Sequence, residues 1–189
     1  MRKIPSEYDN PLDSIFINIC DNTCEYFKNL NFTPNILTTI SLLLAIISVI
    51  LFYYDYYTMA AILFLLSYLY DCYDGHFARK YDMATEFGCY YDHASDIFKY
   101  LLLGVVLFYK SKEKFYSIMP IFLSLSFLMM IHMGCQESFT DHNVRSDSLS
   151  YLQNLCPARP EIALNYTRFF GCGTLNLFIA YVIFSFGYF

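Results

Sequence analysis

The chain has 189 residues, of which 57% are hydrophobic and only 15% are charged, and its mean hydropathy is +0.37. A soluble domain carries about 25% charged residues, so the chain has too few polar side chains to cover a water-soluble globule. The same numbers exclude a disordered chain, and a net charge of −5 without a cluster of Lys or Arg excludes a nucleic-acid-binding protein, which leaves a polytopic protein of the lipid bilayer.

The first predicted element is an amphipathic helix that precedes the first long apolar stretch. Asn10 and Pro11 are typical of a helix start, with Asn as the N-cap and Pro in the first helical position. Apolar residues then recur at helical spacing up to Leu30, with acidic and amide side chains between them. The pattern fits a helix that lies in the membrane interface, and a helix packed on the rest of the protein explains it equally well.

Five apolar stretches follow, and each is a candidate membrane span because a bilayer core needs about 20 mainly apolar residues per helix. They lie near residues 35–54, 57–79, 88–109, 115–134 and 170–189. The second and third reach full length only if their carboxylates lie inside the membrane. We therefore predict an all-α transmembrane bundle over residues 34–189, preceded by a tail and the interfacial helix over residues 1–33.

Lys and Arg residues predict how this multi-pass protein is oriented. An N-terminus in the cytoplasm places most of them on the cytoplasmic side, including the turn between the second and third spans. In a eukaryote the expected location is the endoplasmic reticulum membrane. The glycosylation sequons at Asn31 and Asn165 fall on the same side, so both should remain unmodified.

The 7 cysteines are an odd number without a CxxC pair. Their scattered positions predict reduced, structural thiols rather than a zinc site.

Four carboxylates and several small residues lie within the second and third predicted spans. At helical spacing, one face of the second span presents Asp71, Asp74, Gly75 and Ala78. One face of the third span presents Gly88, Asp92 and Asp96. An ionisable residue inside a span costs about 2.5–3.5 kcal/mol, so such residues indicate function by default.

The chemistry of this set points to a metal-bound pyrophosphate. Adjacent carboxylates in a medium of low polarity must protonate or bind cations, and oxygen-only ligands favour hard ions such as Mg²⁺, Mn²⁺ or Ca²⁺. Arg79 supplies a guanidinium suited to phosphate, and the small residues leave room near the backbone. The plainer alternative is an acidic helix pair neutralised by Arg79, Lys80 and Lys99, but it does not explain the glycines.

Together the two faces form the motif Asp71-x2-Asp74-Gly75-x2-Ala78-Arg79-x8-Gly88-x3-Asp92-x3-Asp96, which is similar to the full signature of the CDP-alcohol phosphotransferase (CDP-alcohol phosphatidyltransferase) family. Pro34-Asn35-x2-Thr38 also resembles an element common in that family. The resemblance implies a membrane enzyme of phospholipid synthesis that transfers a phosphatidyl or phospho-alcohol group from a CDP-alcohol to an acceptor alcohol and releases CMP. CDP-diacylglycerol is the leading donor. Family members commonly have six spans, for which Pro160–Arg168 is a candidate remnant, and a homodimer is a family expectation.

The resemblance also implies roles for individual residues. Asp71, Asp74, Asp92 and Asp96 would hold two Mg²⁺ or Mn²⁺ ions, and Asp96 would also be the general base. The residues expected to hold the CDP moiety are Gly75, Ala78, Arg79, Gly88, Asn35 and Thr38. Three further residues are candidates for the acceptor side: Lys99, His132 and Arg168. Each also has a structural explanation, as a counter-ion, a backbone partner or part of the positive-inside bias, respectively.

The acceptor alcohol is harder to predict. Asp74-Gly75-His76, Thr85-x-Phe87-Gly88 and Tyr166-Thr167-Arg168 followed by Asn176 resemble eukaryotic phosphatidylinositol synthases, so inositol is the leading acceptor. Asp92-His93 resembles choline and ethanolamine phosphotransferases, and Arg145, Arg159 and Arg168 would suit glycerol 3-phosphate. Two hypotheses of another class are a cation transporter and a catalytically inactive membrane subunit; the intact Asp, Gly and Arg pattern opposes both.

Overall fold

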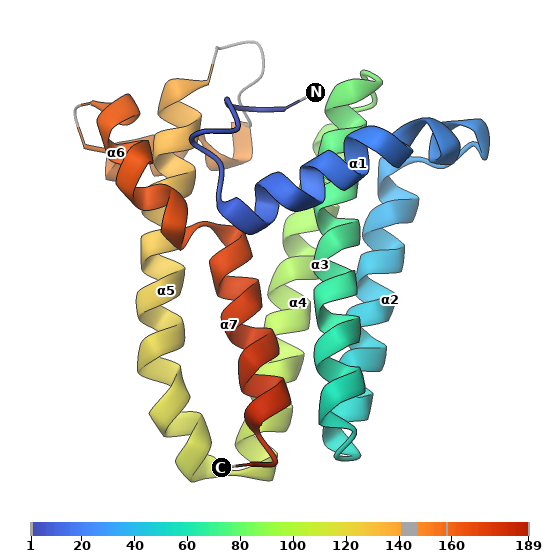
Figure 1. The fold of residues 1–189 in the computed structure, drawn as a ribbon, viewed down its shortest axis with the longest axis vertical. Coiled ribbons are helices and arrows are strands. Elements are labelled where there is room, and N and C mark those ends of the chain that lie inside the picture. The colour runs from blue at the N-terminus through green and yellow to red at the C-terminus, as the bar shows by residue number, and fades with distance from the viewer. Residues whose placement is uncertain (1, 141–146, 158, 189) are drawn as a thin grey trace.

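A computed structural model describes residues 2–140, 147–157 and 159–188, and all regular structure within these ranges is helical (Figure 1). The α-helices are α1 (Pro11–Asn29), α2 (Pro34–Tyr53), α3 (Tyr57–Lys80), α4 (Glu86–Lys110), α5 (Lys112–Phe139), α6 (Pro160–Thr167) and α7 (Cys172–Ser185). Two 3₁₀ segments, η1 (Asp147–Leu155) and η2 (Arg168–Phe170), flank α6. The predicted all-α bundle is thus confirmed, while Arg145 lies outside the described residues.

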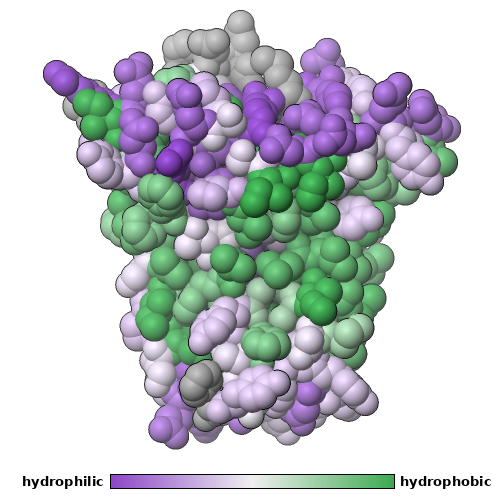
Figure 2. Space-filling model, in the orientation of Figure 1, coloured by the Kyte–Doolittle hydropathy of each residue, from purple (hydrophilic) through white to green (hydrophobic). Residues whose placement is uncertain are grey.

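The surface is divided as in a membrane protein. Figure 2 shows apolar residues gathered along the middle of the molecule and hydrophilic residues at its ends, most densely at the end that carries α1. Among the described residues, three stretches are long and apolar enough to cross a bilayer: Pro34–Tyr53, Lys112–Phe139 and Pro160–Ser185. The helices α3 and α4, with 24 and 25 residues, are about 36–38 Å long, so length does not distinguish them from these three. What distinguishes α3 and α4 from the three apolar stretches is their acidic residues.

Small residues hold α2 and α3 together as a tight hairpin. The Ser48 hydroxyl donates to the carbonyl oxygen of Ala60 at 2.7 Å, and Ser41 donates to the carbonyl of Ser67 at 2.9 Å. Small and hydroxyl side chains allow this close approach of helices in a bilayer and satisfy their own polar groups there. The resulting register brings the first turns of α2 beside the last turns of α3.

Helix α1 crosses one end of the bundle (Figure 1). It begins as predicted, because Asn10 Oδ1 accepts a hydrogen bond from Leu12 N at 3.1 Å, just ahead of Pro11. Cys20 and Cys24 are buried against α3. Large apolar side chains on α1 remain exposed, among them Ile15, Ile19 and Tyr26. The helix therefore packs on the bundle and also exposes apolar surface, and its position in the membrane interface stays a prediction.

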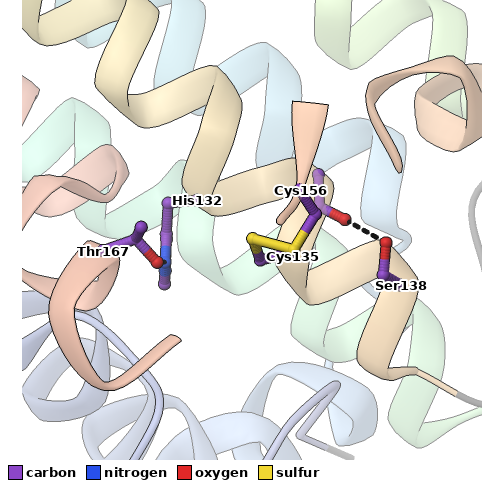
Figure 3. The surroundings of a disulfide bond; sticks show 6 residues. His132, Cys135, Ser138, Cys156 and Thr167 are labelled. Carbon is purple, nitrogen blue, oxygen red and sulfur yellow. Dashed lines mark hydrogen bonds between the residues drawn. A yellow bond between two sulfur atoms is a disulfide. The ribbon is translucent and has the colours of Figure 1, made fainter. Parts of the chain in front are cut away.

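The prediction of reduced thiols is wrong for one pair, because Cys135 of α5 and Cys156 form a disulfide bond (Figure 3). A Cβ atom at Gly134 would lie 2.1 Å from the carbonyl oxygen of Leu152, so glycine is what allows η1 to approach α5 this closely. The pairing depends on that approach, which cysteine spacing does not reveal. The free cysteines, in agreement with the prediction, are Cys20, Cys24, Cys72, Cys89 and Cys172.

The last third of the chain differs in its boundaries from the prediction. Helix α5 runs to Phe139 instead of ending near residue 134, because the polar residues after this point find partners: Glu137 is fully buried and forms an ion pair with Lys3. The stretch considered as a remnant helix is α6, which leads through η2 into α7. These contacts bring the N-terminal tail, α5 and α6 together at the end of the molecule where α1 lies (Figure 1).

Candidate active site

The predicted motif runs from the end of α3 through a short turn into the start of α4. The turn is tight, with Asp82 at a positive φ of 53°. Thr85 then caps α4, since its Oγ1 accepts a hydrogen bond from the Gly88 N–H at 3.0 Å. Both helices pack against α2, and the motif side chains occupy the space between them.

Three of the four predicted metal ligands converge. Asp71 of α3 and Asp92 and Asp96 of α4 each offer a carboxylate oxygen, and these three oxygens lie within 4.8 Å of one another. All three residues are half-buried, so they are sheltered from water but remain reachable. A set of hard oxygen donors this close together fits a divalent cation such as Mg²⁺ or Mn²⁺.

The ammonium group of Lys99 lies among these carboxylates. Its Nζ is 3.0 Å from Asp71 Oδ1 and 2.5 Å from Asp96 Oδ1, and the side chain is only 2% exposed. A buried lysine needs such partners because an uncompensated charge is costly away from water. The position agrees with the counter-ion interpretation of Lys99 and links the acid on α3 to the acid on α4.

Asp74 stands slightly apart from the three converging carboxylates. It is buried, with 5% of its surface exposed, and its Oδ2 accepts a hydrogen bond from Thr38 Oγ1 at 2.5 Å. Thr38 comes from the Pro-Asn element at the start of α2, so the structure connects the two sequence signals. The hydroxyl orients this carboxylate from behind, as partners of metal-binding carboxylates commonly do.

The two glycines of the motif allow side chains to approach the helix backbones. A Cβ atom at Gly75 would lie 3.2 Å from Arg79 Nη1, and one at Gly88 would lie 3.0 Å from Asn35 Oδ1. The guanidinium of Arg79 therefore folds back over α3, and the amide of Asn35 reaches across to α4. The half-buried Ala78 follows one turn after Asp74. The residues predicted to hold the CDP moiety are thus gathered around the carboxylates.

The remaining acceptor-side candidates, His132 and Arg168, are engaged in other contacts. The buried ring of His132 lies beside Thr167, whose Oγ1 is 3.1 Å from its Nδ1 (Figure 3). Gln136 Nε2 is 3.0 Å from the Nε2 of the same ring. The guanidinium of Arg168 donates to the backbone carbonyl of Glu7 and lies over the ring of Phe169 at 4.8 Å. These contacts tie α5, α6 and the N-terminal tail together beside the site.

Sequence reasoning missed two acidic residues near the motif. Asp13 accepts hydrogen bonds from the hydroxyl of Tyr68 and from the backbone N–H of Gly173, at the start of α7. Burial raises the pKa of Asp13 to about 7 and that of Asp9 to about 6, and the nearby charges of Arg2 and Arg79 oppose the rise at Asp9. Helical spacing placed Asp13 on a polar face. Only the contact with α7, about 160 residues later, shows that this face is covered.

The comparisons with known proteins bear on the motif directly. The chain matches the family described as CDP-alcohol phosphatidyltransferase over residues 31–151, more than half of its length, and the match includes the whole motif and the Pro-Asn element. Comparisons with curated proteins and with solved structures gave no match. Members of the family are membrane phosphotransferases of phospholipid synthesis that move a phospho-alcohol group from a CDP-alcohol and generally depend on divalent cations. The chain belongs to the CDP-alcohol phosphatidyltransferase family.

Proposed function

We propose that the protein transfers a phosphatidyl group from CDP-diacylglycerol to the hydroxyl of inositol and releases CMP. The observation that carries the proposal is the convergence of Asp71, Asp92 and Asp96 within 4.8 Å, beside glycines that let Arg79 and Asn35 lie against the helix backbones. A structural ion pair would need the acids but not a guanidinium and an amide held next to them.

The donor set fits a pair of Mg²⁺ or Mn²⁺ ions held by Asp71, Asp74, Asp92 and Asp96. Bound there, the ions would neutralise the pyrophosphate and stabilise the leaving CMP. Thr38 orients Asp74, and Lys99 balances part of the negative charge from the other side. The protein thus supplies a site of high negative charge whose geometry is held by neutral and cationic neighbours.

Asp96 acts as the general base in this proposal. The acceptor oxygen forms a bond to the phosphorus that carries diacylglycerol, and the bond from that phosphorus to the oxygen of CMP breaks. The hydroxyl proton moves to the Asp96 carboxylate, so the acceptor attacks as an alkoxide-like oxygen. Arg79 and Asn35, next to the two glycines, hold the pyrophosphate and the rest of the CDP moiety.

The choice of inositol rests on the resemblance of the segments around Gly88, Tyr166 and Asn176 to phosphatidylinositol synthases. His132 and Arg168 form the acceptor side, next to the start of α7. Choline- or ethanolamine-type transfer, with diacylglycerol as the acceptor, and transfer to glycerol 3-phosphate are the alternatives within the family.

For the molecule in its membrane we propose five spans, formed by α2, α3, α4, α5 and α7, with the carboxylates at the cytoplasmic end. The antiparallel course of α3 and α4 beside α2 supports this number (Figure 1). A homodimer in the membrane is also proposed, on family grounds.

The deciding experiment measures CMP release by the purified protein with Mg²⁺ or Mn²⁺. One arm supplies CDP-diacylglycerol with inositol, serine or glycerol 3-phosphate; the other supplies CDP-choline or CDP-ethanolamine with diacylglycerol. Release that requires inositol, and stops when EDTA removes the ions, is the expected result. Release with another pair would correct the substrate, and no release in any arm would favour a transporter or an inactive subunit.

A further inference from the structure

An apolar cavity of about 60 Å³ lies between α4, α5 and α7, below the carboxylate site. Its walls include Tyr100, Leu103, Gly104, Phe122, Phe178 and Ile183. Such a lining offers almost no partners to water, and apolar cavities of this kind remain dry and take up hydrocarbon instead. The cavity is therefore suited to a segment of an aliphatic chain.

The upper end of the cavity adjoins the site. Tyr100 lines it, and the Tyr100 ring centre is 5.5 Å from the ammonium of Lys99, which contacts Asp71 and Asp96. The Tyr100 hydroxyl is held by Asn176 of α7 at 3.2 Å. From there the lining follows α4 down to Leu107, a distance of about 10 Å along the helix axis. A molecule with a polar head at the carboxylates would have its tail at this level.

Gly104 keeps one wall of the cavity open. A Cβ atom added there would meet no atom within 4 Å, so helix packing does not require the glycine. A glycine inside a helix is destabilising relative to alanine. Gly104 thus makes α4 less stable than alanine would, and it leaves free space facing the cavity.

The α5 wall also allows lateral entry from the bilayer. Only 17% of the apolar stretch of α5 is buried, compared with 39% for α2 and for the segment containing α7. Lining residues on α5, such as Phe122, are only half-buried. A lipid tail can therefore reach the cavity from the hydrocarbon core without passing through the polar end of the molecule.

We propose that this cavity between α4, α5 and α7 holds a segment of one acyl chain of CDP-diacylglycerol, beyond its first four carbons. The inference rests on the proposed function, because it takes the pyrophosphate of that donor to be bound at the carboxylates. The protein would then bind two parts of its donor: the charged pyrophosphate at the carboxylates, and an acyl chain one helical turn deeper.

The test compares Gly104→Leu, which fills the cavity, with Val105→Leu, a matched change at a neighbouring position that is 66% exposed. CMP release is measured with dioleoyl and with dibutanoyl CDP-diacylglycerol. We expect Gly104→Leu to lower kcat/KM about tenfold for the dioleoyl donor, the equivalent of about two buried methylene groups, and to leave the dibutanoyl donor unaffected. Val105→Leu should leave kcat/KM unchanged for both donors.

A second measurement does not depend on turnover. Wild-type protein is labelled with a CDP-diacylglycerol whose acyl chain carries a photoreactive diazirine, with unlabelled dioleoyl donor as the competitor. Competed labelling of residues 100–107, 118–122 or 178–183 supports the proposal, even if no acceptor alcohol proves active. Competed labelling confined to other helices overturns it, as does equal activity of wild type and Gly104→Leu on the dioleoyl donor. Absence of CMP release by wild type with every acceptor would instead count against the proposed function.

Discussion

Asp96 is placed between partners of opposite charge, since Lys99 Nζ lies 2.5 Å from its Oδ1 and two further carboxylates face it. Asparagine at this position preserves the shape but cannot accept the proton of the acceptor alcohol. We expect Asp96→Asn to reduce turnover by about 10²–10⁴-fold. Binding of CDP-diacylglycerol in the presence of Mn²⁺ should persist, because the other carboxylates remain. CMP release and titration calorimetry measure the two properties separately.

The control for this change is Asp55→Asn, at the opposite end of the molecule. Asp55 lies in the α2–α3 turn at a positive φ of 68°, a conformation that asparagine also tolerates. The control should behave as wild type in both assays. Wild-type turnover by Asp96→Asn would show that another group takes the proton.

Thr38 provides a milder perturbation of the same site. Valine in its place has nearly the same shape but cannot donate to Asp74, whose buried carboxylate would lose this partner. Loss of such an orienting hydrogen bond typically costs 10–100-fold in metal affinity or activity. We therefore expect Thr38→Val to raise the Mn²⁺ concentration needed for half-maximal CMP release by about that factor. Exposed Thr58→Val, near the α2–α3 turn, is the control, and an unchanged Mn²⁺ requirement would argue against a role for Asp74 in metal binding.

At the level of elements, the junction of α1 with α7 depends on a missing side chain. A Cβ atom at Gly173 would lie 2.3 Å from Asp13 Oδ1 and 2.4 Å from Asn10 Oδ1. Gly173→Ala should therefore push α1 away from α7 and lower the free energy of unfolding by about 1–3 kcal/mol, as overpacking does. The thermal unfolding midpoint in detergent measures this. Gly104→Ala is the matched control: nothing lies within 4 Å of its Cβ position, so its midpoint should stay or rise. Equal midpoints for the two variants would contradict the tight junction.

The same junction predicts how stability depends on pH. Burial raises the pKa of Asp13 from 3.8 to about 7, so the folded state holds this proton more tightly than the unfolded state. Its contribution to stability is therefore complete below about pH 4 and is lost as the pH rises through about 7. Tyr68 and Asp71 on α3, Cys172 on α7 and Asp9 in the tail surround the group, and Asp9, with a pKa of about 6, acts in the same direction.

Asp13→Asn should remove this dependence, because asparagine keeps the acceptor oxygen and has no proton to lose. Between about pH 5 and pH 8 the unfolding midpoint of the variant should fall less than that of wild type. Glu25→Gln, on the exposed side of α1, is the control and should follow wild type. Parallel pH profiles for wild type and Asp13→Asn would contradict the burial of this carboxyl.

On the scale of the whole molecule, helical spacing in the sequence predicts which residues share a helix face. It does not predict which distant segments come into contact. The interval of four places Asp92 and Asp96 on one face of α4, and the short turn after α3 brings Asp71 to that face. The disulfide and the α1–α7 junction depend on which helices become neighbours, and hydropathy does not specify this. Each contact has a glycine at the point of closest approach, Gly134 at the disulfide and Gly173 at the α1–α7 junction. A glycine in a sequence, however, does not show which segment packs against it.

The carboxylate end of the molecule carries two opposing indications of its compartment. The Lys and Arg distribution predicts a cytoplasmic location for the carboxylate end, whereas Cys135 and Cys156 form a disulfide at this same end, and disulfides are rare in reducing compartments. We expect the charge distribution to determine the orientation in the membrane, because it acts during insertion, before the cysteine pair can form.

Labelling with a membrane-impermeant maleimide tests this orientation in sealed vesicles with the cytoplasmic side enclosed. Ser6→Cys places an exposed thiol in the tail at the carboxylate end, and Glu113→Cys places one at the opposite end; wild type sets the background. Glu113→Cys should react at once and Ser6→Cys only after permeabilisation, with Asn31 and Asn165 free of glycans. The reverse labelling, together with a glycan on either asparagine, would place the active site in an oxidising compartment, because the disulfide could then persist there.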